Sequence, residues 1–309
     1  MAYQSGQIIE ASNSTTDDFN ELAALINEVY GDSHSGDHAV ATGTFGYGQS
    51  PEIATVAAGD VITAAQWTEI FSSLAKCANH QGTPVGAIPG LVTTGDIINI
   101  FDSPNGTNDL INDIRTNKLL IDPSEAAITL GGSKHSETRS TSWTSSVTHE
   151  FDVEFTDEDE ARHFFNAGGE IHWSGQYSPG GSEESGEEAD WALELSNMGT
   201  VAFNYNNTTA GAGATFGIGY YDIIETYQTI ADKSINGGGG YYVTEGVTVA
   251  VKATDSSMNV LRFKVVFATD PDPDRVLDGE LVSMVDQKIS VNNIASVEPT
   301  YSPVIFIGS

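Results

Sequence analysis

Residues 143–155 read WTSSVTHEFDVEF, and this stretch decides the fold of the larger part of the chain. Large or apolar side chains recur at every second position over most of it, with polar residues between them. The alternating set is Trp143, Ser145, Val147, His149, Phe151, Val153 and Phe155. A period of two predicts a long β-strand that has one apolar face.

A short helix is expected directly after this strand. Thr156 is its predicted N-cap, and the acidic residues 157–160 occupy its first turn. Carboxylates at a helix N-terminus interact favourably with the helix dipole, so this acidic run needs no catalytic explanation. The helix should end within Asn166-Ala167-Gly168-Gly169, and a new strand should begin at Glu170.

Further strand patterns follow, separated by glycine-rich turns such as residues 211–213 and 237–240. The candidate strands are residues 191–195, 201–205, 223–231, 242–252, 260–268, 279–291 and 304–307. Eight or nine strands with one short helix favour an antiparallel, jelly-roll-like β-sandwich. We therefore expect a β-sandwich domain over residues 141–309.

The first 120 residues have helical rather than strand periodicity. Apolar residues recur at helical spacing over residues 17–30 and again over residues 109–120. Between these segments, Thr63 and Gln66 have the spacing of a capping box, which predicts the start of another helix. Its apolar face consists of Trp67, Ile70, Phe71, Leu74 and Cys77.

These helices can cover one another's apolar faces and form a small bundle. We expect residues 1–120 to be a helical docking or oligomerisation region, joined to the sandwich by a linker at residues 121–140. The fold class is therefore predicted to be α+β. Residues 31–49, which include Gly46-Tyr47-Gly48, form a long predicted loop that we expect to clasp a neighbouring subunit.

The charge excludes several classes of function. The chain has 309 residues, with 43 acidic and 12 basic side chains, and its net charge is −31. Nucleic-acid binding and attachment to anionic membranes both require clustered Lys and Arg, so neither partner is expected. The acidic surface suits a protein that stays soluble in salty water, where self-repulsion is screened.

Targeting and cysteine patterns point to synthesis in the cytosol. The first residues show no signal-peptide pattern, and no apolar run is long enough for membrane insertion. Cys77 is the single cysteine, so no intrachain disulfide can form.

No catalytic motif is present in the sequence. A nucleophile elbow, an H-E-x-x-H helix, a P-loop and a dinucleotide fingerprint are all missing. Paired carboxylates of the kind glycosidases use stay open as an alternative, but acids are so frequent here that proximity alone means little. We expect a protein that is not an enzyme.

Two segments contain possible metal ligands. Asp270, Asp272 and Asp274 alternate with two prolines, and their carboxylates suit calcium, although the favoured interpretation is a rigid acidic connector. His34 and His38 lie beside aspartates in the long N-terminal loop and have the chemistry of zinc ligands, but a solvated polar loop is the favoured interpretation there. No other cofactor is expected.

Several stretches together resemble virion structural proteins of marine tailed phages, especially phages of cyanobacteria. The most specific is residues 161–171, ARHFFNAGGEI. The others are residues 1–10, 45–49, 59–67, 80–83, 269–271 and 276–281.

This resemblance implies a structural protein of the tail, baseplate or fibre, located in the virion and acting in assembly or host attachment. Other virion proteins are the implied partners, with a homo-oligomer such as a trimer or a sixfold ring. Host surface glycan is a further possible partner. Two alternatives stay open: a capsid decoration or head-fibre protein, and a module that binds or, less plausibly, cleaves host glycan.

The signature near residue 165 has the chemistry of a scaffold rather than of a catalyst. Phe164 and Phe165 are expected to anchor the helix, Asn166 and Gly168 to form its C-terminal turn, and Gly169 to let the next strand start sharply. Together with Trp67 and Phe71, these are the expected binding or assembly positions.

Overall fold

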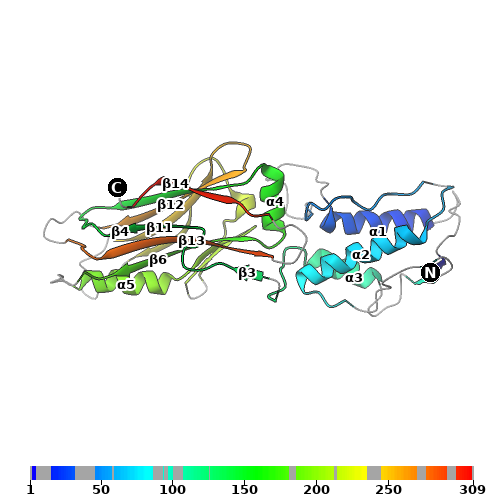
Figure 1. The fold of residues 1–309 in the computed structure, drawn as a ribbon, viewed down its shortest axis with the longest axis horizontal. Coiled ribbons are helices and arrows are strands. Elements are labelled where there is room, and N and C mark those ends of the chain that lie inside the picture. Colours follow the sequence, from blue (N-terminus) through cyan, green and yellow to red (C-terminus); the bar gives the residue numbers. More distant parts are fainter. Residues whose placement is uncertain are drawn as a thin grey trace. The chain divides into compact units, whose positions relative to one another are not determined.

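The computed structural model describes most of the chain, which has an α+β fold with helices and antiparallel sheets (Figure 1). The described residues are 2–4, 15–31, 46–57, 59–85, 93, 97–99, 107–124, 126–180, 186–211, 214–234, 245–269, 276–290 and 297–307. The chain divides into two compact units. The first comprises residues 1–126, 162–168 and 290–296, and the second comprises residues 127–161, 169–289 and 297–309.

The first unit contains three helices and a small antiparallel pair of strands. The helices are α1 (Thr15–Tyr30), α2 (Ala64–Gln81) and α3 (Thr107–Thr116), and the strands are β1 (Ala2–Gln4) and β2 (Ile97–Asn99). The capping box is confirmed: the Gln66 backbone N–H donates to the Thr63 hydroxyl, and the Gln66 side chain accepts from the Thr63 N–H at 2.8 Å. Gly82 ends α2 in the left-handed conformation, with φ of 69°.

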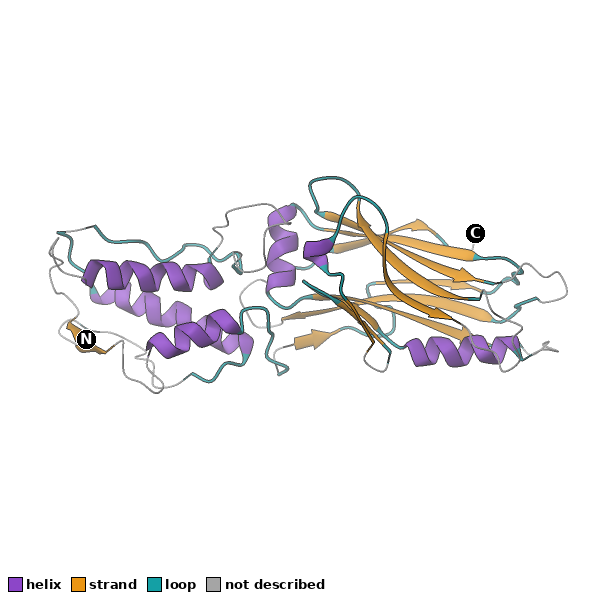
Figure 2. Cartoon of the chain, turned by 180° about the vertical axis from the view of Figure 1, so that it is seen from behind, coloured by secondary structure: helices purple, strands orange, loops and turns teal. Residues whose placement is uncertain are grey.

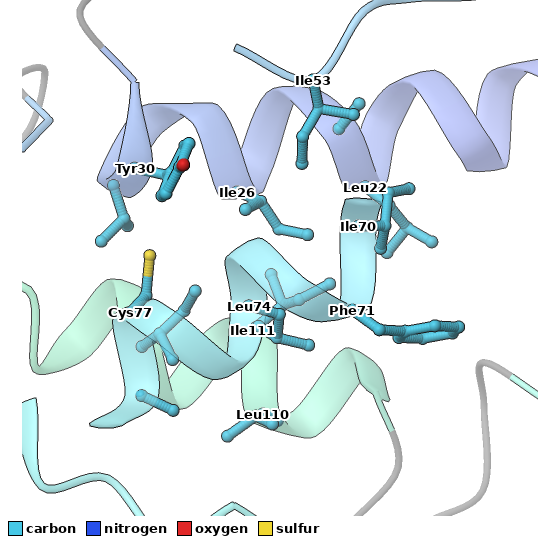
Figure 3. Packing of buried hydrophobic residues seen from close by; sticks show 14 of the residues in the cluster. Leu22, Ile26, Tyr30, Ile53, Ile70, Phe71, Leu74, Cys77, Leu110 and Ile111 are labelled. Atoms are coloured by element: carbon cyan, nitrogen blue, oxygen red, sulfur yellow. The ribbon is translucent and has the colours of Figure 1, made fainter. Parts of the chain in front are cut away.

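The core of this unit is formed by the apolar faces of its three helices, as Figure 3 shows. Ile26 of α1, Leu74 of α2 and Ile111 of α3 are fully buried at its centre. Phe19 and Trp67 pack edge to face, with ring centroids 5.2 Å apart. Because each helix has a single apolar face, none of them could bury it without the other two.

The second unit contains two large antiparallel sheets. The five-stranded sheet has the order β10 (Gln228–Ser234), β11 (Gly246–Ala253), β12 (Val260–Ala268), β5 (Val147–Glu154) and β14 (Thr300–Ile305). The seven-stranded sheet has the order β3 (Ala126–Ile128), β13 (Glu280–Ser290), β6 (Glu170–Ser178), β7 (Val201–Phe203), β8 (Thr208–Ala210) and β9 (Ala214–Phe216), with β4 (His135–Arg139) also paired to β13.

The strands of the second unit are drawn as orange arrows in Figure 2. Aromatic side chains from the two sheets meet between them. Trp173 of β6 lies 6.1 Å from Phe267 of β12, and Phe203 of β7 lies 5.6 Å from Phe263 of β12, measured between ring centroids. The bounds predicted for β12 and β13 are close to those observed, because both strands carry long and regular patterns.

Strand β5 departs from the simple alternation that its sequence predicts, because its outward residues are buried as well. Glu150 and Asp152 are only 9% and 8% exposed. Arg262 donates twice to Asp152, at 2.7 and 2.8 Å, and Lys264 lies 3.7 Å from Glu150. Since each pair is directly opposite across β5 and β12, the long basic side chains cover the carboxylates.

Two further helices are α4 (Glu158–Asn166), whose residues 162–166 belong to the first unit, and α5 (Glu187–Met198), which belongs to the second. The predicted strand at residues 191–195 is therefore wrong, and so is the expectation of one short helix. Trp191, Leu195 and Met198 are buried at helical spacing, and acidic residues fill the first turn of α5. A short apolar run fits either period, and here the acidic first turn was the signal for a helix.

The segment expected as a linker, residues 121–140, contains β3 and β4. Both pair with β13, β4 alongside residues 281–285 and β3 farther along the strand, where the Thr129 N–H donates to the Gln287 carbonyl. Strands of three and five residues carry too few alternating positions to be recognised from sequence.

Phe71 offers a test of the helical core. Phe71→Ala should lower the free energy of unfolding by about 3–5 kcal/mol, because it removes a buried ring and leaves a cavity. Chemical denaturation followed by circular dichroism would measure the loss. Leu120→Ala is the control: Leu120 is 53% exposed, and its truncation should change the stability by less than about 0.5 kcal/mol. Equal effects of the two substitutions would contradict the described core.

Candidate functional site

The signature at residues 161–171 forms the C-terminal half of α4 and the turn after it. Phe164, Phe165 and Asn166 are at most 2% exposed, and the two rings pack edge to face at 4.9 Å. Gly168 has φ of +78°, and a Cβ there would lie 3.2 Å from Ile121. Gly169 directly precedes β6. These residues are thus packed inside the protein, and their predicted role as a tight turn fits this conformation.

Residues 162–168 make polar contacts within the first unit. The ring of His80, at the end of α2, lies with Nε2 3.0 Å from the carbonyl oxygen of Ala167. The side-chain amide of Asn166 donates to the carbonyl of Gly46 at 3.5 Å. The signature therefore holds the Gly46 segment and the end of α2 together.

The Gly46-Tyr47-Gly48 segment binds back on the end of α1. The Tyr47 N–H donates to the Val29 carbonyl and the Gly48 N–H to the Gly31 carbonyl, both at 2.9 Å. A Cβ on Gly46 would lie 2.2 Å from the Gly31 carbonyl oxygen, and Gly48 has φ of +70°, so both positions need glycine. Residues 32–45 lie outside the described part of the chain, and the expectation that this loop clasps a neighbouring subunit stays a prediction.

A buried polar network continues from Tyr47. Its hydroxyl donates to the Lys118 carbonyl at 2.5 Å and accepts from the Gln81 amide at 2.8 Å. The same amide donates to the Ile114 carbonyl at 2.9 Å. Burial raises the pKa of Tyr47 well above its usual value, so the hydroxyl stays protonated and keeps its donor role. The network links α2, α3 and the Tyr47 segment.

The second unit contains its own buried hydrogen-bond network, which is centred on His149. Its Nδ1 lies 2.7 Å from the Ser283 hydroxyl, and its Nε2 lies 3.3 Å from Nε2 of His135. Trp173 donates its indole N–H to the same hydroxyl at 2.8 Å. The network links β5 in one sheet with β4, β6 and β13 in the other.

A serine hydroxyl beside a histidine is also the geometry of an activated nucleophile. Here Ser283 and His149 are both 0% exposed, and the hydroxyl already accepts the Trp173 hydrogen bond. A substrate carbonyl cannot reach a group enclosed in this way. The pair therefore acts as a polar connection between the two sheets.

Burial, with a smaller contribution from His135, lowers the pKa of His149 to about 3. Burial also lowers the pKa of His135 and raises that of Glu137, whose carboxylate lies 3.4 Å from the His135 ring. His149 is therefore neutral in the folded protein near pH 7 and stays neutral well into the acidic range.

This neutrality makes stability depend on pH. A histidine in the unfolded chain takes up a proton below about pH 6.5, whereas folded His149 does not, so stability falls as the pH falls through this range. Between pH 7.5 and 5 the contribution of His149 should amount to about 2 kcal/mol. His149→Asn keeps a polar group near Ser283 but cannot titrate, so its stability should fall less steeply over this range. Denaturation curves measured across the range would check this, and parallel pH profiles would contradict it.

Glu188 is a buried carboxylate held by several hydrogen bonds. It is 1% exposed, and its Oε1 accepts from the Tyr177 hydroxyl and the Asp278 N–H at 2.8 Å and from the Gly279 N–H at 3.0 Å. Its Oε2 accepts from the Gly180 N–H at 2.8 Å. Burial alone would raise the pKa of Glu188, but these hydrogen bonds lower it below its usual value.

The acidic run at residues 183–188, in a Gly- and Ser-rich context, predicts a solvated loop between strands, and the structure overturns part of this prediction. Glu187 and Glu188 are buried at the start of α5, and residues 183–185 lie outside the described chain. Gly279, within residues 276–281, lies so close to β6 that a Cβ would be 2.3 Å from the Ser178 carbonyl oxygen. That stretch is therefore also a packed structural connection.

Glu188→Gln should lower the free energy of unfolding by roughly 2–3 kcal/mol, because an amide turned towards the Gly180 N–H leaves a buried donor without an acceptor. Thermal unfolding monitored by circular dichroism would measure the change. Glu225→Gln is the matched control on an exposed loop, where an effect below about 0.5 kcal/mol is expected. If both variants unfold at the same temperature, the buried network does not stabilise this part of the protein.

The predicted metal ligands cannot be placed. Asp270, Asp272 and Asp274, like His34 and His38, lie outside the described residues. Within the part that is described, no group of three or more His, Cys, Asp or Glu side chains is arranged to hold a metal ion. None of the described helices is long and apolar enough to cross a membrane.

Comparisons of the chain with protein-family models, with curated proteins and with solved structures found no match.

Sequence reasoning located some of these residues but not their partners. His149 belongs to the alternating stretch, yet Ser283 is 134 positions away, and nothing in either segment indicates the other. Glu188 appeared only as part of a charge run. Its buried position could have been suspected from the helical spacing of Trp191 and Leu195, which makes residue 188 part of a helix that packs on the sheet.

Proposed function

We propose that this protein is a non-enzymatic structural component of a tailed-phage virion, placed on the tail, baseplate or fibre. The observation that carries the proposal is where the phage-like residues lie. All of residues 164–167 are buried. Asn166 and Ala167 accept or donate buried hydrogen bonds, and Gly168 and Gly279 allow close backbone approaches. A signature of this kind specifies an architecture and not a reaction.

Two further features support an assembly role. Trp67 and Phe71 are each 1% exposed, so they stabilise the helical unit, and any docking surface must be formed by other residues around them. We also assign the two contacting sheets to a jelly-roll-like sandwich, in which aromatic pairs such as Trp173 and Phe267 form the inner layer. A net charge of −31 suits the solvated exterior of a particle.

Intact particles provide the test. Mass spectrometry of purified virions should detect this chain at a fixed copy number divisible by three or six, since tail components follow the tail symmetry. Light scattering of the purified chain should show a homo-oligomer. Immunogold labelling on tails would support the proposed location, whereas labelling on heads would replace it with capsid decoration. A strictly monomeric protein that is missing from virions would refute the proposal.

A further inference from the structure

Strand β6 has one side that is only partly paired. It pairs with β13 over its whole length, Glu170–Ser178, but with β7 only at residues 171–173. Among the described strands, none pairs with the other side of residues 174–178. In this segment the backbone N–H and C=O groups that point away from β13 therefore lack a strand partner.

A groove of about 490 Å³ runs along this unpaired edge. One wall is residues 174–178 themselves, and the other is α5, through Ala192, Leu195 and Ser196. Exposed Gln176 and buried Tyr177 both line the groove, so it follows the strand edge and is not confined to one face of the sheet. A Cβ on Gly175 would lie 2.9 Å from Cδ2 of Leu195, so glycine here allows α5 to lie close to β6.

The chemistry of the groove favours a peptide. Among the described residues, its lining contains hydroxyl, amide and apolar side chains, including Leu195 and Met284 of β13, and no charged residue. Five residues of free strand span about 16 Å, enough for the ladder of a short added strand. Addition of a strand to an exposed sheet edge is a recurring mode of peptide recognition, in which backbone hydrogen bonds provide affinity and pockets on alternate sides provide specificity.

We propose that this groove binds an extended peptide segment of a partner protein, which adds as a strand to β6 at residues 174–178 and lies beside α5. The partner segment is neutral or basic, because an acidic strand would be repelled by a chain of net charge −31. The proposal concerns a binding activity of the second unit and does not rest on a location in a virion.

The experiment uses a display library of random twelve-residue peptides, panned against the full-length chain at physiological salt. The library should yield binders that are poor in Asp and Glu and rich in β-branched residues. Hydrogen exchange of the complex should show protection of alternate amides within residues 174–178, because only those that face the groove gain a partner. Proline placed at successive peptide positions should abolish binding with a period of two.

Ser196→Trp supplies the decisive variant. Ser196 is an exposed residue of α5 that lines the groove, so an indole there should fill it and weaken peptide binding at least tenfold without affecting folding. Leu193→Trp is the matched control, since Leu193 lies on the same helix, is 56% exposed and does not line the groove. If the library yields no binder, or if binders ignore Ser196→Trp or leave residues 174–178 unprotected, the proposal is overturned.

Discussion

The shortage of cations is the constraint on which much of this structure depends. With 43 acidic and 12 basic side chains, most carboxylates cannot find a Lys or Arg. A carboxylate near the interior must then be neutralised by hydrogen-bond donors, and backbone amides are the most abundant. Asp286 is 5% exposed and accepts from the N–H groups of Gly132 and Ser133, at 3.0 and 2.9 Å. Glu188 uses the amides of three residues in the same way.

This solution has a structural consequence. A carboxylate that binds backbone amides fixes the turn that carries them, so buried acids here act as clamps on turns. Glu188 joins residue 180, at the end of β6, to residues 278–279, just before β13. Asp286 holds the turn that leads into β4. Buried acidic residues thus help to fix the turns that connect strands of the seven-stranded sheet.

The scarce cations are placed where backbone donors are already occupied. Within β5, the backbone N–H groups donate to β12 and β14 in the sheet. Glu150 and Asp152 must therefore pair with donors on other side chains. Arg262 and Lys264 of β12 provide them. Arg262 engages Asp152 with two parallel bonds, a geometry that Lys cannot reproduce. The pairing keeps two carboxylates beside an otherwise apolar strand.

The sequence is informative where a pattern is long and local, and uninformative where the partners are distant. The capping box of α2 and the alternating pattern over the nine residues of β12 can both be recognised, because every residue that they need is nearby. α5 is missed because residues 191–195 form a short apolar run that is compatible with either period. The networks of His149 and Glu188 could not be predicted in full, since Ser283 lies 134 positions from His149 and residues 278–279 lie about 90 positions from Glu188. No local rule contains such pairings.

The edges of the two sheets differ in whether another strand can add to them. β10 carries Asp232 and Lys233 and has a register shift, and β14 contains Pro303 and a second register shift. Charges, proline and bulges are the devices by which natural sheets prevent further strands from adding. Residues 174–178 of β6 have none of them, and their register with β13 is regular throughout. In a chain so rich in carboxylates, an uncharged and regular edge beside a helix retains the backbone groups that a partner strand needs.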